Sequence, residues 1–186
     1  IDHSHVPGDA EAQWVSVDGS VVEAALWCGP LAQHSGHTAL VMGAGGPHRL
    51  SGTTDRADAG PLGEFVYEPD GAVIRAGLVG ELAHVTGTHL LDPTIAYLTA
   101  DAPVETPFAR GYRVVEAMPF KVKALAAALR ERGVGTVDIK KRGVDITPEQ
   151  LRPQLKLKGA GRMTVIVTRV AGQRTALLAE PLARDA

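Results

Sequence analysis

Cysteine, aromatic residues and long apolar runs are scarce in this chain of 186 residues. Cys28 is the only cysteine, which excludes an intrachain disulfide and favours a reducing, cytoplasmic setting. No run of about 18 apolar residues occurs, so we predict no transmembrane helix and no membrane partner. Hydrophobic residues make up 45% of the chain and aromatic residues 4%, so the expected core is aliphatic.

Positive charge is scarce in the first part of the chain. Residues 1–108 contain 3 Lys or Arg against 14 Asp or Glu, a net charge of −11, whereas residues 109–186 contain 16 against 7, a net charge of +9. All seven histidines precede residue 109. Such a reversal indicates two units with different partners, and attraction between the two parts is an alternative explanation.

The first part predicts short strands and one helix. Asp18-Gly19, inside the alternating segment Gln13–Leu26, is typical of a two-residue hairpin turn. Apolar residues at helical spacing predict a helix across Ala72–Val85. The other elements expected here are strands at Thr38–Met42 and Glu64–Tyr67, a surface loop at Ser51–Pro61, a short mixed segment at Leu90–Thr99 and a linker at Asp101–Pro107.

The second part predicts a β-α-β-α-β-β unit, which makes the fold class α/β (α+β). Its expected elements are a strand at Tyr112–Met118, a helix at Lys121–Arg132, a strand at Thr136–Lys141, a helix at Thr147–Lys158 and strands at Arg162–Val170 and Arg174–Ala179. Thr147-Pro148-Glu149-Gln150 predicts a capping box, and Gly133 predicts the end of the first helix. Right-handed crossovers would place both helices on one face of a four-stranded sheet and leave the opposite face, or its rim, open to a partner.

Two segments resemble chemical motifs, and each is better explained by a turn. Gly43–Pro47 follows a strand as a phosphate-binding loop would, but no helix follows to direct free N–H groups at an anion. Asp92–Tyr97 resembles the Asp-Pro-Pro-Tyr motif of amino-group methyltransferases, but it lacks the second proline and its aromatic residue is too far along. We interpret Asp92–Tyr97 as a turn followed by the start of a helix.

The histidines and serines do not form a convincing catalytic or metal-binding pattern. His34 and His37, with His3 and His5, would ligate a metal only if the fold brought them together, and no cysteine accompanies them. No Gly-x-Ser-x-Gly elbow is present, so nothing supports a hydrolase. We therefore predict no catalytic residue, no metal and no cofactor in this chain.

The basic residues of the second part are the remaining signal. Cations beside the capped start of the helix at Thr147 would suit phosphate groups, because free N–H donors and full charges act together there. Base-specific recognition has little support, since Tyr112 and Phe120 are the only aromatic residues after residue 108. An ordinary solvated surface is the alternative. The residues predicted to bind RNA phosphates are Lys121, Lys123, Arg130, Arg132, Lys140, Lys141, Arg142, Lys156 and Lys158.

Several longer phrases resemble a known family. They are EAQWVSVDG from Glu11, VEAALW from Val22, YEPDGAVIRAGL from Tyr67, TPFAR from Thr106 and GTVDIKKRGVD from Gly135. Together they resemble the C-terminal part of actinobacterial class I S-adenosylmethionine-dependent methyltransferases that end in a THUMP-like domain.

The resemblance implies three parts. Residues 1–62 would be terminal strands of a methyltransferase sheet, residues 63–108 a helical connector, and residues 109–186 a THUMP-like module that presents RNA, such as tRNA or rRNA, to the catalytic domain. The sequence opens at Ile1 in a polar run and lacks the family's Gly-rich cofactor loop. We therefore interpret it as a fragment, and S-adenosylmethionine as the cofactor of a parent whose N-terminal catalytic domain is missing. We expect no methyl transfer from this chain alone.

A second hypothesis gives the basic module a purely structural role. It would then pack on the acidic first part or mediate dimerisation, without binding nucleic acid.

Overall fold

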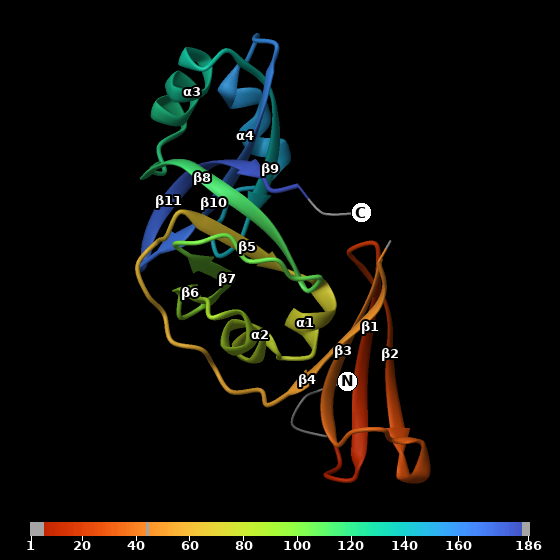
Figure 1. The fold of residues 1–186 in the computed structure, drawn as a ribbon. Coiled ribbons are helices and arrows are strands. Elements are labelled where there is room, and N and C mark those ends of the chain that lie inside the picture. Colours follow the sequence, from red (N-terminus) through yellow and green to blue (C-terminus); the bar gives the residue numbers. More distant parts are fainter. Residues whose placement is uncertain (1–5, 44, 184–186) are drawn as a thin grey trace.

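The computed structural model describes residues 6–43 and 45–183, which form two sheets and four α-helices (Figure 1). The mixed α/β class is confirmed. Among the described residues the longest helix has 10 residues, and none has the length and apolar character of a membrane span.

The first sheet has four strands in the order β2-β1-β3-β4. Its strands are β1 (Ala10–Val17), β2 (Ser20–Cys28), β3 (Gly36–Gly43) and β4 (Gly46–Gly52). The hairpin predicted at Asp18-Gly19 is confirmed, and both residues have positive φ, 48° and 82°, as a tight primed turn requires. β1 and β3 run parallel, and each pairs antiparallel with its other neighbour.

Two short helices replace the single helix expected across Ala72–Val85. They are α1 (Gly71–Arg75) and α2 (Val79–Thr86). Gly77 separates them with a φ of 74°, a conformation that an α-helix cannot contain. The helical spacing of apolar residues persists across the break because Val73, Leu78 and Leu82 all enter the same core.

The second sheet has seven strands in the order β6-β7-β5-β8-β11-β10-β9. Its strands are β5 (Phe65–Pro69), β6 (His89–Asp92), β7 (Ile95–Ala100), β8 (Ala109–Pro119), β9 (Val134–Lys141), β10 (Gly161–Val170) and β11 (Gln173–Pro181). The segment expected to be a helical connector therefore also contributes three strands, β5, β6 and β7, and the sheet continues through them into the C-terminal unit.

The C-terminal unit has the predicted β-α-β-α-β-β order. Its helices, α3 (Val122–Glu131) and α4 (Pro148–Leu155), pack on one face of β8–β11 around Leu125, Leu129 and Leu151. The capping box is confirmed, because Thr147 and Gln150 each accept the other's backbone N–H. α4 ends three residues earlier than expected, where Lys156 adopts a left-handed conformation with a φ of 49°.

The opposite face of this unit is covered, contrary to the expectation that it would be open. The seven-stranded sheet curls until the β6–β7 hairpin packs against β10 and β11, which buries Leu91, Ile95 and Tyr97 with Ile166 and Leu177. The alternation of apolar residues along a strand predicts which side chains are buried. It does not predict that the β6–β7 hairpin, about 70 residues earlier in the chain, buries the side chains of β10 and β11.

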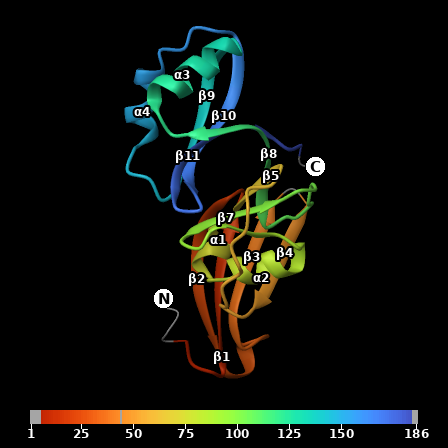
Figure 2. The same ribbon diagram turned by 90° about the vertical axis from the view of Figure 1, so that its left-hand side faces the viewer.

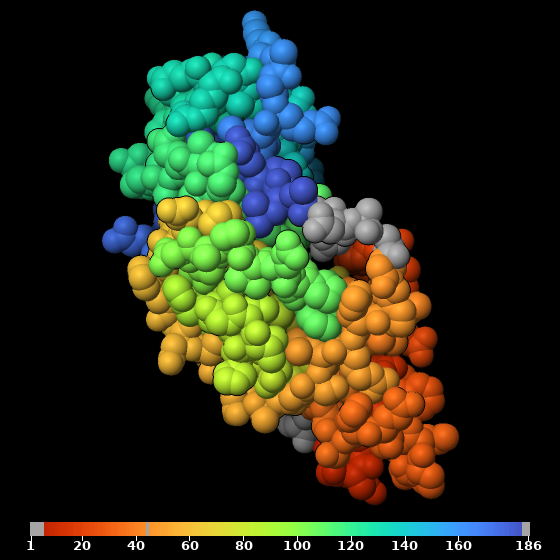
Figure 3. Space-filling view, viewed as in Figure 1, coloured from red at the N-terminus to blue at the C-terminus, as the bar shows by residue number. Residues whose placement is uncertain are grey.

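The helices α1 and α2 lie between the two sheets (Figure 2). One core joins Trp14 and Leu50 of the four-stranded sheet to Leu82 of α2 and to Tyr67 and Leu98 of the seven-stranded sheet. The four-stranded sheet and the helices α3 and α4 occupy opposite ends of an elongated molecule (Figure 3).

Candidate nucleic-acid interface

The strand directions divide the predicted phosphate-binding residues between two ends of the C-terminal unit. β8, β9 and β10 run in the same direction, so their carboxyl ends meet the starts of both helices. Lys121, Lys123 and the run from Lys140 to Arg142 lie at this carboxyl end. Arg130, Arg132, Lys156 and Lys158 lie at the other end, roughly 23 Å away along the eight residues of β9. The nine residues do not form one surface.

Four of the nine predicted cations already have partners inside the molecule. Arg130 donates to the carbonyl of Leu155 at 2.8 Å, and Arg132 pairs with Glu116 at 2.5 Å. Lys140 Nζ lies 3.5 Å from Glu68, and the Arg142 guanidinium lies 5.5 Å from the centre of the Tyr97 ring.

The other five are exposed, with no ion pair or hydrogen bond to any residue that the structure describes. They are Lys121, Lys123, Lys141, Lys156 and Lys158.

Side-chain alternation along β9 explains why Lys140, Lys141 and Arg142 have different environments. Val137 and Ile139 face the helices, so Lys141 points to the same side and into solvent. Lys140 points to the opposite, curled face, and Arg142 also packs there against Tyr97. Burial, together with the negative charge of Glu68, raises the pKa of Tyr97 and so keeps its hydroxyl neutral beside Arg142.

Two arginines that the sequence analysis missed extend the cations at the carboxyl end. Arg169 and Arg174 are paired across the β10–β11 hairpin and share the face of Lys141. The Arg174 guanidinium lies 5.7 Å from the centre of the Phe120 ring, while Arg169 Nε donates to the carbonyl of Gly143 at 2.8 Å. Strand pairing places these two arginines here, and no short sequence motif predicts that pairing.

We call Lys121, Lys123, Lys141, Arg169 and Arg174 the carboxyl-end surface. Lys141, Arg169 and Arg174 lie at adjacent ends of β9, β10 and β11, and Lys121 and Lys123 lie at the start of α3, just after β8. These four strands are successive neighbours in the sheet. The row therefore crosses about 14 Å at the usual strand spacing.

The start of α4 is a weaker phosphate site than expected. The N–H of Gln150 is bonded to Thr147 at 3.2 Å, and Pro148 has no N–H to offer. Hydrogen bonding within the first turn lowers the pKa of Glu149, so this exposed side chain is a carboxylate that competes with an incoming phosphate.

A profile of the THUMP domain-like family matches residues 109–181. This part of the chain resembles that family and is called the THUMP-like domain below. Over 166 residues the chain is 37% identical to two Mycobacterium tuberculosis proteins, from strains CDC 1551 and H37Rv, each named an uncharacterized S-adenosylmethionine-dependent methyltransferase. The match covers 87% of this chain and 45% of each relative, so the chain spans less than half of their length. The resemblance to this methyltransferase family is confirmed.

The fold also occurs in a solved structure. A candidate methyltransferase from Porphyromonas gingivalis W83 superposes with a TM-score of 0.70 at 21% identity, over 93% of this chain and 46% of that one. At this identity the likeness concerns the fold alone. The part of that protein that matches this chain is thus less than half of its length, as in the two mycobacterial relatives.

The glycine-rich segment that begins at Gly43 is a turn and does not lead into a helix, as the sequence analysis predicted. Gly43 and Gly46 flank a hairpin turn between β3 and β4, and a strand rather than a helix follows, so no free helix N-terminus faces a ligand. Ala44 lies outside the described residues. A surface hollow of about 200 Å³ is lined by Asp55, Arg56 and the β6–β7 turn, with no residue from β1 or β3.

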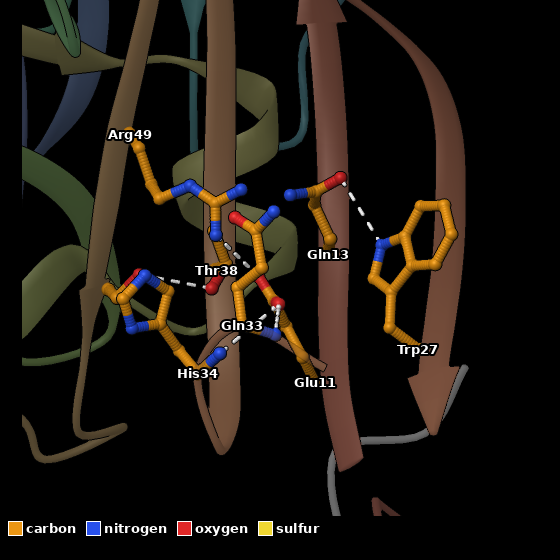
Figure 4. Close-up of polar contacts among 8 residues, drawn as sticks. Glu11, Gln13, Trp27, Gln33, His34, Thr38 and Arg49 are labelled. Atoms are coloured by element: carbon orange, nitrogen blue, oxygen red, sulfur yellow. Dashed lines mark hydrogen bonds and ion pairs between the residues drawn. The ribbon is translucent and has the colours of Figure 1, made fainter. Parts of the chain in front are cut away.

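A buried carboxylate organises the outer face of the four-stranded sheet, the face turned away from α1 and α2 (Figure 4). Glu11 is 1% exposed and accepts from Arg49 at 2.8 Å. Its other oxygen accepts the backbone N–H groups of Gln33 and His34 at 3.0 and 3.4 Å. Burial alone would raise the pKa of Glu11, but these hydrogen bonds, one from Thr38 and the Arg49 charge lower it.

The position of this cluster indicates a structural role. Glu11 lies at the amino end of β1, whereas ligands of parallel sheets bind beyond the carboxyl ends of the strands. Its bonds fasten residues 33–34 of the β2–β3 connection onto the sheet. Sequence analysis missed Glu11, because strand alternation places it opposite the core residues Ala12 and Trp14 and does not show that the β2–β3 connection covers it.

Asp92 is also structural, which agrees with the rejection of a methyltransferase motif there. Its carboxylate accepts the N–H and hydroxyl of Thr94 at 2.9 and 2.7 Å and the N–H of Gly172 at 2.8 Å. A hairpin turn, not the expected helix, follows it. Burial opposes ionisation, yet these bonds and the Arg169 charge lower the pKa of Asp92.

The fold does not bring His34 and His37 together. His37 lies on the inner face, where Nδ1 is 2.8 Å from the carbonyl of Ala76, while the backbone of His34 bonds Glu11 on the outer face. His3 and His5 lie outside the described residues. In residues 6–43 and 45–183, no group of three His, Cys, Asp or Glu is arranged to hold a metal.

Proposed function

We propose that this chain is the C-terminal part of an S-adenosylmethionine-dependent methyltransferase whose THUMP-like domain binds RNA through the carboxyl-end surface. The observation that carries the proposal is the row of cations at the ends of β9, β10 and β11 and at the start of α3, which follows β8. Lys121, Lys123 and Lys141 are exposed there without a partner among the described residues, so each is available to a phosphate. The methyl donor would bind in the rest of the parent protein.

The expected mode of binding is electrostatic docking. Lysines and arginines supply the salt-dependent, largely sequence-independent part of nucleic-acid affinity. Phe120 is partly buried beneath Arg174, which leaves few aromatic faces for stacking and disfavours base-specific recognition. The module would hold the RNA, and chemistry would occur elsewhere in the parent.

The test compares two triple variants with equal changes of charge. Lys121→Ala/Lys123→Ala/Lys141→Ala removes cations from the carboxyl-end surface, and Lys156→Ala/Lys158→Ala/Arg162→Ala removes three from the opposite end. Binding to unfractionated tRNA is measured by fluorescence anisotropy over a series of salt concentrations. We expect the first variant to lower the slope of log Kd against log salt by about 2 to 3, since each lost contact contributes roughly 0.7 to 0.9.

The second variant should retain the wild-type slope. Wild-type affinity that does not change with salt contradicts RNA docking, and equal losses in both variants contradict the assignment to the carboxyl-end surface.

The structural role is the second candidate, and specific contacts favour it. Lys140 pairs with Glu68 from β5, and the N–H of Gly172 donates to Asp92 from β6. These bonds join the THUMP-like domain to the preceding segment. They do not involve the carboxyl-end lysines, so both roles are compatible in one chain.

A further inference from the structure

The outer face of the four-stranded sheet is uncovered over its carboxyl-terminal half. Val15 pairs with Leu40 and Val17 with Met42 along the parallel strands β1 and β3, and all four side chains point away from α1 and α2. We call these four residues the outer patch. Val17 and Met42 are 39% and 40% exposed.

The cover that the described chain provides stops short of this patch. Gln33 and His34 reach Glu11 at the amino end of the face, and no described helix lies beyond them (Figure 1). Purely parallel sheets occur almost only with both faces covered, and β1 and β3 form a parallel pair at the centre of this mixed sheet. The inner side of the same pair obeys this rule, because α1 packs on β1 and β3 there.

Polar residues of opposite charge flank the outer patch. Glu23 of β2 pairs with Val15 on one side, and Arg49 of β4, which is also ion-paired with Glu11, pairs with Leu40 on the other. An apolar strip between charged rims is the complement of an amphipathic helix, whose apolar face lies inward and whose polar flanks meet the rims.

We propose that the outer patch is the seat of an amphipathic helix from the remainder of the parent methyltransferase chain. The relatives and the solved structure both contain this unit in chains about twice as long, which supplies a covalently linked occupant. A helix from the same polypeptide binds at high effective concentration and completes the layered sheet. This inference rests on the proposed parentage but not on RNA binding.

Thiol accessibility tests the proposal. In a Cys28→Ser background, a single cysteine is introduced by Met42→Cys in the outer patch or by Val85→Cys on α2, where the valine is 56% exposed. Rates of labelling with a maleimide are compared between the 186-residue chain and the full natural reading frame that contains it.

The expected result is labelling of Met42→Cys at least about tenfold slower in the longer protein, since labelling then requires local opening, and equal rates for Val85→Cys. Equal rates at both positions overturn the proposal. Protection of Met42→Cys in the 186-residue chain, together with a dimer in sedimentation velocity, would identify a second copy as the occupant and also overturn it. Loss of RNA binding with intact protection would count against the RNA proposal only.

Discussion

Charged residues serve different ends in the two parts of the molecule. In residues 6–108 the decisive charges are buried carboxylates, Glu11 and Asp92, each holding several N–H donors. In the THUMP-like domain the decisive charges are exposed lysines with no partner among the described residues. The comparison teaches that burial and bonding, rather than the sign of the local net charge, separate charges that maintain the fold from charges available to a ligand.

The largest expected effect comes from separating the two parts. Residues 109–186 expressed alone would expose Tyr112, Ile166 and Leu177, which are at most 1% exposed in the whole chain. Each costs about 1.5–3 kcal/mol when returned to water, so we expect no cooperative thermal transition by circular dichroism. A fragment that unfolds cooperatively, with amide chemical shifts like those of the full chain, would show that the domain does not depend on the β6–β7 hairpin.

Glu11→Gln tests the buried carboxylate that serves the fold in the four-stranded sheet. We expect a loss of about 2–3 kcal/mol in the free energy of unfolding at neutral pH, because Arg49 loses its partner. The exposed neighbour Glu23→Gln is the matched control and should change stability by less than about 0.5 kcal/mol.

The same carboxylate predicts a pH dependence. The folded-state pKa of Glu11 is lowered from 4.5, so its contribution is complete above that pH and disappears as the pH falls through the folded-state value. The difference in the free energy of unfolding between wild type and Glu11→Gln, measured by urea denaturation, should therefore become smaller as the pH is lowered. A gap that stays constant down to about pH 3 would mean that the charge of Glu11 is unimportant.

Asp92→Ala has a smaller expected effect because one hairpin contact is lost. We expect about 1–2 kcal/mol of destabilisation from the missing bonds to Thr94 and Gly172. Hydrogen exchange of the Gly172 amide should accelerate, and Asp145→Ala, at an exposed position, should leave it unchanged. An unaltered Gly172 amide in the Asp92 variant would contradict a clamp between β6–β7 and β10–β11.

The smallest effect on stability is expected from the carboxyl-end lysines. Lys121→Ala/Lys123→Ala/Lys141→Ala should change the free energy of unfolding by no more than about 0.5 kcal/mol, since exposed side chains without partners contribute little. Urea denaturation measures this directly. A loss of several kcal/mol in the free energy of unfolding would show that these lysines stabilise the fold. It would contradict the distinction between structural charges in the first part and available charges in the second.

Local signals predicted much of the fold. The Asp18-Gly19 turn and the Thr147 capping box depend on residues at most three apart, and both occur as expected. The break at Gly77 was missed, because apolar spacing reports which side chains are buried and not whether the backbone between them remains helical.

The candidate site was predicted only in part. Lys121, Lys123 and Lys141 are exposed as expected, whereas Lys140 and Arg142, adjacent to Lys141, turn into the curled sheet. Arg169 and Arg174 join the same surface through strand pairing alone.

The sequence by itself determined the order of strands and helices in the THUMP-like domain, because turns, caps and alternation act between near neighbours. Only the tertiary structure decided which face of that domain is closed and which lysines remain free. The physical reason is distance along the chain: the bond from Gly172 to Asp92 joins residues 80 positions apart, and no local pattern records such a contact.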